Sequence, residues 1–209
     1  MIFFLRIQCL LKQTDGSNMK EIILASGAPR RKELLEQIGI DFTVIPATRE
    51  EYITSTIPRE VVEELSLQKA KEVASLPPFV GSSDIVIGSD TLVALSGRIM
   101  GKPKDKKDAF AMLKALQGNT HTVYTGVTFI VTSIVPQIIT FSEAAKVSMY
   151  KMSDAEIRAY IATGEPMDKA GSYGIQGRCA AFISRIEGEY NTIVGLPIAH
   201  VYQVLKTLL

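Results

Sequence analysis

The sequence predicts a mixed α/β fold in which a twisted sheet is flanked by helices. Apolar runs typical of strands are interspersed with segments whose apolar residues recur at helical spacing. Residues 22–46 give strand, helix and strand in succession, which is an opening βαβ-like unit. The 209 residues suffice for one large or two small packed lobes, and 46% hydrophobic and 22% charged residues are ordinary for a globular protein.

The opening unit has a tight turn between its first strand and its helix. Residues 22–24 are apolar and predict the end of a buried strand, and a Ser-Gly pair supplies the turn. Pro29 fits the first helical position, where its missing N–H is no loss. Apolar residues then recur at helical spacing until Gly39 ends the helix, and residues 40–46 alternate like a strand.

Two arginines, Arg30 and Arg31, fall in the first turn of this predicted helix. Cations are disfavoured there, because a helix N-terminus already carries partial positive charge. With a polyphosphate present the same residues form an anion site, since free N–H groups, helix dipole and guanidiniums all favour an anion. The alternative is a pair of solvated arginines on a surface helix.

A second helix is predicted over residues 58–75, after a polar loop that carries Glu50 and Glu51. The apolar stripe of this helix places Lys69 at the centre of its core-facing line. Such a lysine either snorkels to water or points into a polar site. For the two glutamates the alternative is an ordinary solvated loop.

Residues 84–95 predict one buried strand that continues into another, with an interruption at residues 88–89. Asp90 and Thr91 stand inside this apolar surround. Burying a lone carboxylate is costly unless it is paired or bound to a metal, and an Asx turn is the alternative. A Ser-Gly hairpin turn returns the chain to Lys102, which is either held on a stiff loop by its Gly and Pro neighbours or is a plain surface lysine.

The remainder of the chain continues the alternation of helices and strands. The predicted elements are a helix at 105–117, strands at 122–134 and 144–150, a capping-box helix from Ser153 to Gly164, a last hairpin made of 180–186 and 192–194, and a closing helix from Pro197. Between them, residues 168–177 carry three glycines at three-residue spacing, which indicates backbone packed close to another group. This segment matches neither a dinucleotide fingerprint nor a phosphate loop.

Composition excludes several classes of function. A net charge of +1 provides no bulk field for nucleic acid, and the chain has no aromatic stacking row. Two cysteines without paired spacing exclude a Cys-based zinc site and a disulfide framework, and they fit a reducing compartment, so we expect a cytoplasmic protein. No apolar run is long enough to span a membrane, so no membrane partner is expected.

We expect residues 1–18 to form an extension, disordered or loosely docked, with Met19 as the natural start. Residues 1–11 are mostly apolar and resemble a weak signal segment. However, the cationic start is thin and no clear cleavage site follows.

Five motifs, in this order and spacing, resemble the Maf family of nucleoside triphosphate pyrophosphatases. They are Leu-Ala-Ser-Gly-Ala-Pro-Arg-Arg at 24–31, Gly-Ser-Asp-Thr at 88–91, Gly-Lys-Pro at 101–103, Asp-Lys-Ala-Gly-Ser-Tyr-Gly-Ile-Gln-Gly at 168–177, and Val-Gly-Leu-Pro at 194–197. The resemblance implies one domain over residues 19–209 with an inosine-triphosphatase-like fold and two lobes around a central cleft. It further implies hydrolysis of a nucleoside triphosphate to the monophosphate and pyrophosphate with Mg²⁺ or Mn²⁺, and a homodimer, as is often found in the family.

Three positions separate the family's dTTP/UTP subgroup from its 7-methyl-GTP subgroup. The methyl-GTP subgroup typically has Trp, Gln and Glu where this chain has Arg30, Thr91 and Gln176. All three residues here match the dTTP/UTP pattern. The resemblance therefore implies dTTP, UTP and modified pyrimidine nucleotides as substrates, with these three side chains reading the base.

The remaining unusual residues then fit one triphosphate–metal site. We expect Asp90 to ligate the metal and to orient the attacking water or act as its general base, with Glu51 as its carboxylate partner. Arg31, Lys69 and Lys102 are expected to neutralise the phosphates as pyrophosphate leaves.

The first motif departs from the family at one position. Ser26 and its turn amides are expected to help bind the phosphates, but Ala28 stands where the family usually has Ser. This is the predicted N-cap, and losing the hydroxyl should cost the helix about 1 kcal/mol. Arg178 and Cys179 also replace the usual small residues, at the rim of the expected base pocket.

The alternative function is a non-catalytic nucleotide-binding regulator of cell division or septum formation. Such a protein would use the same cationic cleft but would need no metal-binding carboxylate. The joint presence of Asp90, Glu51, Lys69 and Lys102 favours catalysis.

Overall fold

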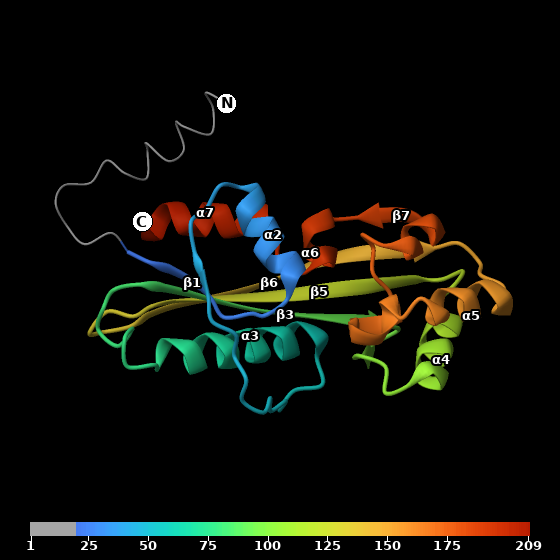
Figure 1. Ribbon diagram of the computed structural model, residues 1–209, viewed down its shortest axis with the longest axis horizontal. Helices are drawn as coiled ribbons and strands as arrows, with labels where there is room; N and C mark the ends of the chain where they lie inside the picture. Colours follow the sequence, from blue (N-terminus) through green and yellow to red (C-terminus); the bar gives the residue numbers. More distant parts are fainter. Residues whose placement is uncertain (1–19) are drawn as a thin grey trace, which may run out of the picture.

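The computed structural model describes residues 20–209, so the expectations for residues 1–18 and Met19 lie outside the described residues. Within that range the chain forms a seven-stranded mixed sheet with helices on both faces (Figure 1). The strands are β1 (Ile22–Leu24), β2 (Thr43–Val44), β3 (Ile85–Leu95), β4 (Arg98–Met100), β5 (Thr120–Val131), β6 (Gln137–Met149) and β7 (Ile183–Glu187). The α-helices are α2 (Pro29–Gln37), α3 (Pro58–Ala74), α4 (Lys106–Leu116), α5 (Asp154–Ala162), α6 (Tyr190–Val194) and α7 (Ile198–Leu208), and the 3₁₀ turns are η1 (Glu165–Asp168), η2 (Ala170–Ser172) and η3 (Arg178–Phe182).

The predicted α/β class and the opening βαβ unit are confirmed. The strand order is β2-β1-β3-β5-β6-β7, with β4 paired to β3. Strands β2, β1 and β3 are parallel, and the pairs from β3 to β7 are antiparallel. Helix α2 connects β1 to its parallel neighbour β2, as the sequence of strand, helix and strand requires.

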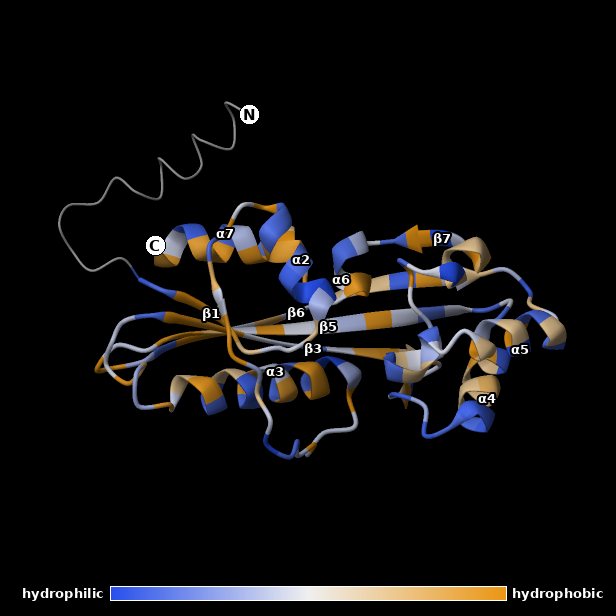
Figure 2. Ribbon diagram, viewed as in Figure 1, coloured by the Kyte–Doolittle hydropathy of each residue, from blue (hydrophilic) through white to orange (hydrophobic). Residues whose placement is uncertain are grey.

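Side chains of the central strands alternate between two covered faces. Ile22 and Leu24 of β1 join the large core, whereas Ile23 packs with Val73 of α3 and Val86 of β3. Figure 1 shows α2 and α7 above the sheet and α3 below it. In Figure 2, β1 and the adjoining part of the sheet are strongly hydrophobic. Because both faces are buried here, β1 is apolar at every position, and so are the first three residues of β3.

Helix α3 lies very close to the sheet at two glycines. A Cβ atom on Gly88 of β3 would lie 2.2 Å from the carbonyl oxygen of Ser66, and one on Gly126 of β5 would lie 2.2 Å from that of Val62. The helix backbone therefore occupies the space of a side chain. This close approach sets α3 directly beside the part of β3 that carries Asp90.

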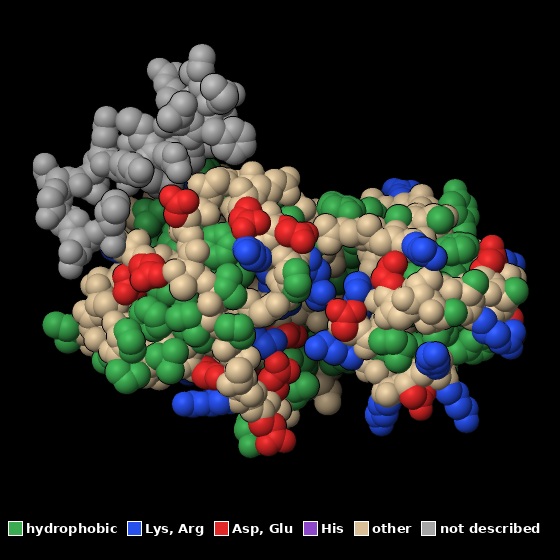
Figure 3. All heavy atoms as spheres, in the orientation of Figure 1, with side chains coloured by type: hydrophobic (Ala, Val, Ile, Leu, Met, Phe, Trp, Pro, Cys, Tyr) green, Lys and Arg blue, Asp and Glu red, His purple; other side chains and the backbone are tan. Residues whose placement is uncertain are grey.

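The predicted two-lobe arrangement is confirmed by the long strands. In Figure 1, β3, β5 and β6 extend through both ends of the molecule. One end holds β1, β2, α2, α3 and α7, and the other holds α4, α5, β7 and the 3₁₀ turns. Figure 3 shows Lys, Arg, Asp and Glu side chains gathered at the waist between the two lobes.

The predicted interruption at residues 88–89 is wrong. Strand β3 runs unbroken from Ile85 to Leu95, and Gly88 pairs with Thr128 of β5. The glycine marks the close approach of α3 rather than a break in the strand. Asp90 lies within this strand, opposite Gly126, so the Asx-turn alternative is also wrong.

The predicted last hairpin is also wrong. Residues 178–182 form a 3₁₀ turn, only residues 183–187 form a strand, and Thr192 to Val194 belong to helix α6. Strand β7 pairs instead with β6. The β-branched run favours a strand, but burial of Thr192, Ile193 and Val194 in the fold overrides that local preference.

Other element boundaries differ in length only. The strand predicted at 40–46 is reduced to Thr43 and Val44, and the one at 144–150 begins earlier, at Gln137. The helices predicted at 58–75 and 105–117 and the closing helix are confirmed to within one residue at each end. The capping box of Ser153 and Glu156 is present.

Candidate active site

A cavity of about 610 Å³ lies at the waist, between the first turn of α2, helix α3, strand β3 and the loop that follows β4. It contains every side chain that the sequence assigned to phosphate or metal binding. These are Ser26, Arg31, Glu51, Lys69, Asp90 and Lys102. They come from five separate segments of the chain, and only the tertiary fold brings them together.

An ammonium group lies between two carboxylates in this cavity. Lys69 of α3 contacts Asp90 Oδ1 and also lies 2.9 Å from Glu51 Oε1. The side chains of Lys69 and Asp90 are each 16% exposed, and that of Glu51 is 47% exposed. Of the two alternatives for Lys69, the structure therefore shows the polar site. The pairing also offsets the cost of partly burying Asp90.

Arg31 is buried and makes three hydrogen bonds within the protein. Its Nε donates to the carbonyl oxygen of Gly195 at 2.8 Å, Nη1 donates to Ser26 Oγ at 3.0 Å, and Nη2 donates to Thr91 Oγ1 at 3.1 Å. Since a guanidinium has five N–H donors, two remain for a ligand. Burial lowers the pKa of Arg31 to about 10, and the nearby Asp90 carboxylate acts in the opposite direction. The group therefore keeps its charge at neutral pH.

The hydroxyl groups around Arg31 have defined hydrogen-bonding roles. Ser26 Oγ accepts from Arg31 and, at 3.3 Å, from the N–H of Ala28, so its own O–H is left to donate to a ligand. Thr125 donates to the carbonyl oxygen of Thr192 at 2.7 Å, so in the 2.9 Å contact of Thr91 with Thr125 it is Thr91 that donates. Thr91 then retains acceptor capacity only.

The start of α2 lacks a side-chain cap. Ala28 is the N-cap residue, as predicted, and no side-chain hydrogen bond caps the helix. The first turn contains no acidic residue. Figure 2 shows this turn as hydrophilic, in agreement with the presence of Arg30 and Arg31. Its N–H groups and cations together suit an anion.

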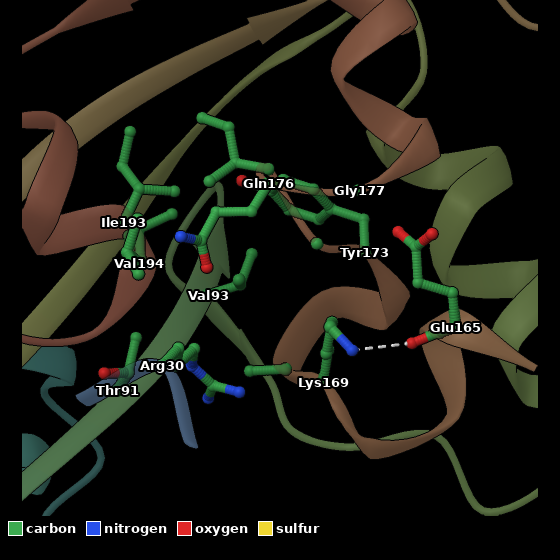
Figure 4. Close-up of a pocket in the computed structure, with 14 residues that line it drawn as sticks. Arg30, Thr91, Val93, Glu165, Lys169, Tyr173, Gln176, Gly177, Ile193 and Val194 are labelled. Carbon is green, nitrogen blue, oxygen red and sulfur yellow. Dashed lines mark hydrogen bonds between the residues drawn. The ribbon is translucent and has the colours of Figure 1, made fainter. Parts of the chain in front are cut away.

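A second cavity of about 310 Å³ adjoins the first. Arg30 and Thr91 line both cavities, and Gln176 lines the second, so all three predicted base-reading residues are present here. In Figure 4, Gln176 points into this cavity toward Val93 and Val194. The mixture of apolar walls with one amide and one guanidinium suits a flat, polar ring.

The donor set at the waist fits a hard divalent cation. Asp90 and Glu51 supply carboxylate oxygens, the ligands that Mg²⁺ prefers, and both already attract the Lys69 ammonium. Within residues 20–209 there is no group of three or more His, Cys, Asp or Glu side chains placed to hold a metal ion. An ion here would therefore depend on water and phosphate oxygens for its other ligands.

The sequence analysis did not predict the hydrogen bonds that hold the loop carrying Glu51. Four side chains at four-residue spacing on α3 hydrogen-bond to it, and the pairs are Glu60–Ser55, Glu64–Thr54, Gln68–Tyr52 and Glu72–Thr48. The hydrogen bond from the Thr54 hydroxyl lowers the pKa of Glu64. The signal was present as a polar stripe with a period of four on this helix.

A second missed element is the backbone at Gly195. Its carbonyl oxygen accepts from Arg31 Nε at 2.8 Å and from Ser89 Oγ at 3.0 Å. Gly195 has φ +126°, and a Cβ there would lie 3.2 Å from Thr91 Oγ1. The Val-Gly-Leu-Pro motif is part of the sequence pattern, but no side chain in it indicates that its backbone holds an arginine.

Together, the two lobes and the paired cavities define an α/β protein with a cleft suited to a polyanion attached to a ring. The chain belongs to the family of Maf-like proteins, whose model matches residues 21–208. No helix among residues 20–209 has the length and apolar character needed to cross a membrane.

Two relatives with similar sequences have the same name. The dTTP/UTP pyrophosphatase of Agathobacter rectalis is 54% identical over 201 residues, covering 91% of this chain and 98% of that protein. The dTTP/UTP pyrophosphatase of Lachnoclostridium phytofermentans is 50% identical over 190 residues, covering 90% and 95%. Among solved structures, the Ham1 protein of Staphylococcus aureus aligns with a TM-score of 0.46 at 14% identity, covering 90% of this chain and 99% of that chain.

Proposed function

We propose that this protein hydrolyses nucleoside triphosphates, principally dTTP and UTP, to the nucleoside monophosphate and pyrophosphate, with a divalent cation. One observation carries the proposal: the charged cavity, which is lined by three carboxylates and four cationic side chains, adjoins the smaller cavity that contains Gln176. The names of relatives 50% to 54% identical support the same substrates. The buried free thiol of Cys179 fits a reducing compartment, and we infer a cytoplasmic location.

The triphosphate would occupy the larger cavity. Arg31 has two N–H donors to spare, Ser26 has its O–H, and Lys102 lines the same cavity. These groups face a ligand with several negative charges and would neutralise the pyrophosphate as it leaves. Because the protein holds Arg31 in place beforehand, little reorganisation would accompany binding.

Asp90 is the residue that we expect to activate the attacking water. The carboxylate of Asp90 orients the water toward the α-phosphorus and accepts its proton as the bond from phosphorus to the bridging oxygen breaks. Lys69 holds Asp90 and Glu51 in the same cavity. Asp90 and Glu51 are the residues that would hold Mg²⁺ or Mn²⁺, and the ion would supply Lewis-acid stabilisation of the phosphate charge.

The base would occupy the smaller cavity. Uracil and thymine present one N–H donor between two carbonyl acceptors. The amide of Gln176 offers one acceptor and two donors, and Thr91 retains an acceptor. This pattern matches uracil and thymine better than cytosine, whose ring nitrogen at the same place is an acceptor.

The test is pyrophosphate release from dTTP and UTP with Mg²⁺, measured with malachite green after addition of inorganic pyrophosphatase. The Asp90→Asn variant is expected to lose at least about 100-fold in kcat, because general acid–base catalysis contributes that much. Asp84→Asn is the matched control, since Asp84 caps the N–H of Glu21 just before the same strand and an amide oxygen can still accept that bond. Release by Asp90→Asn at the wild-type rate would refute the mechanism.

A further inference from the structure

Two side chains outside the motif of residues 168–177 hold the segment that carries Gln176. Glu165 Oε1 accepts the phenolic O–H of Tyr160 at 2.8 Å, and Tyr160 in turn accepts the backbone N–H of Gly174 at 3.1 Å. Glu165 Oε2 accepts the backbone N–H of Arg178 at 3.1 Å. The segment of residues 174–178 is therefore tied at both ends, and Gln176 lies at its centre.

The chemistry of this arrangement calls for an ionised carboxylate and a protonated phenol. Both partners of Glu165 are donors, and they approach different oxygen atoms, so both terminal atoms must accept, which an amide cannot do because its nitrogen only donates. Tyr160 is 4% exposed. Burial raises the pKa of Tyr160, and so does the hydrogen bond to Glu165, so the phenol keeps the proton that it donates.

Two glycines of the motif fit against these groups. A Cβ on Gly177 would lie 2.1 Å from Glu165 Oε1, and one on Gly174 would lie 2.8 Å from Lys169 Cε. Lys169 Nζ donates to the carbonyl oxygen of Glu165 at 2.9 Å. The predicted close packing of these glycines is thus confirmed, and its partners are the Glu165 carboxylate and the stem of Lys169. In the view of Figure 4, Glu165 and Gln176 lie on opposite sides of Tyr173.

We propose that Tyr160 and Glu165 are positioning residues that fix residues 174–178 and thereby hold Gln176 where it discriminates between pyrimidine bases. Neither residue needs to touch the substrate. The positioning follows from the geometry alone, whereas the discrimination rests on the proposed function. The two parts are therefore tested by separate measurements.

The first measurement is the ratio of kcat/KM for UTP to that for CTP. In Tyr160→Phe and Glu165→Gln the ratio is expected to fall about tenfold, mainly through a higher KM for UTP, which is the effect of one lost charged hydrogen bond. A merely structural defect would lower kcat/KM for UTP and for CTP by the same factor and leave their ratio unchanged. That result would overturn the proposed role of these residues in base discrimination. Glu187→Gln on β7 is the matched control, because Glu187 pairs with Lys146 and Arg185 rather than with this segment.

The second measurement is hydrogen exchange at the N–H groups of Gly174 and Arg178. Exchange in Tyr160→Phe and Glu165→Gln should be about tenfold faster than in the wild type, because each N–H loses part of its anchorage. If the two variants exchange these N–H groups at the wild-type rate, the proposed positioning role is overturned, whatever their activity. If the wild-type protein hydrolysed neither nucleotide, the proposed function would fail, and the exchange rates would still decide the positioning.

A third variant disturbs the arrangement from the segment's own side. Gly177 has an extended backbone with φ −103° and ψ −154°, and the three atoms nearest to a Cβ at this position all belong to the Glu165 carboxylate. Gly177→Ala should lower the UTP-to-CTP ratio as Glu165→Gln does. Adding Glu165→Ala to Gly177→Ala should cause little further loss, because both changes break the same contact. Additive losses would contradict the proposal.

Discussion

Acidification should destabilise this protein through one buried histidine. His121 of β5 is 2% exposed, its Nε2 lies 2.7 Å from the Tyr173 hydroxyl, and its Nδ1 has no hydrogen-bond partner. Burial lowers the pKa of His121 from 6.5 to about 4. Between these two values the unfolded chain binds a proton that the folded chain does not, so stability falls as pH falls through this window.

The structure sets the magnitude of this effect. The fall in pKa from 6.5 to about 4, at about 1.4 kcal/mol for each pH unit, corresponds to about 3 kcal/mol of unfolding free energy lost on acidification. Carboxylates such as Glu64, whose pKa is lowered from 4.5, contribute stability that is lost only below that value. Between about pH 6.5 and pH 4.5, the pH dependence of the unfolding free energy therefore reports the titration of histidine.

The assay is urea unfolding of the wild type, His121→Gln and His200→Gln at several pH values across that interval. The chain has two histidines, so His200→Gln is the matched control and should retain the steep loss of stability. His121→Gln should be less stable at neutral pH and should show a flatter pH dependence. The reasoning is refuted if the wild type and His121→Gln lose the same free energy over the interval.

Two further changes test the construction of the cleft. Ala28→Ser restores an N-cap hydroxyl at the start of α2 and should raise the unfolding free energy by about 1 kcal/mol in urea denaturation; an unchanged or lower value would show that the position does not act as a cap. Gly88→Ala should cost about 1–3 kcal/mol or more, because its Cβ would lie 2.2 Å from the carbonyl oxygen of Ser66. Gly101→Ala, with nothing within 4 Å of its Cβ, should be tolerated in the same denaturation experiment, and equal losses at both glycines would contradict the close approach of α3.

Much of the site could be predicted because its residues are anomalous in their local context. Arginines at a helix start, a lysine on an apolar stripe and an aspartate inside an apolar run each break a local rule, and such violations concentrate at functional sites. The structure brings Arg31, Lys69 and Asp90 into one cavity. Thr125, which contacts Thr91, and Glu165, which holds the segment around Gln176, break no local rule and give no comparable signal. The polar residues of α3 show only a period of four, which is also common on a solvated helix face.

The sequence by itself determined the α/β class and most of the helices, and it singled out the charged residues that the structure brings into one cavity. Only the tertiary structure decided that β3 is continuous, that residues 192–194 are helical, and which backbone atoms hold Arg31 and the segment around Gln176. The physical reason is that periodicity and capping depend on neighbours along the chain. By contrast, the contact of Arg31 with Gly195 spans 164 residues, and no local pattern encodes its distance or direction.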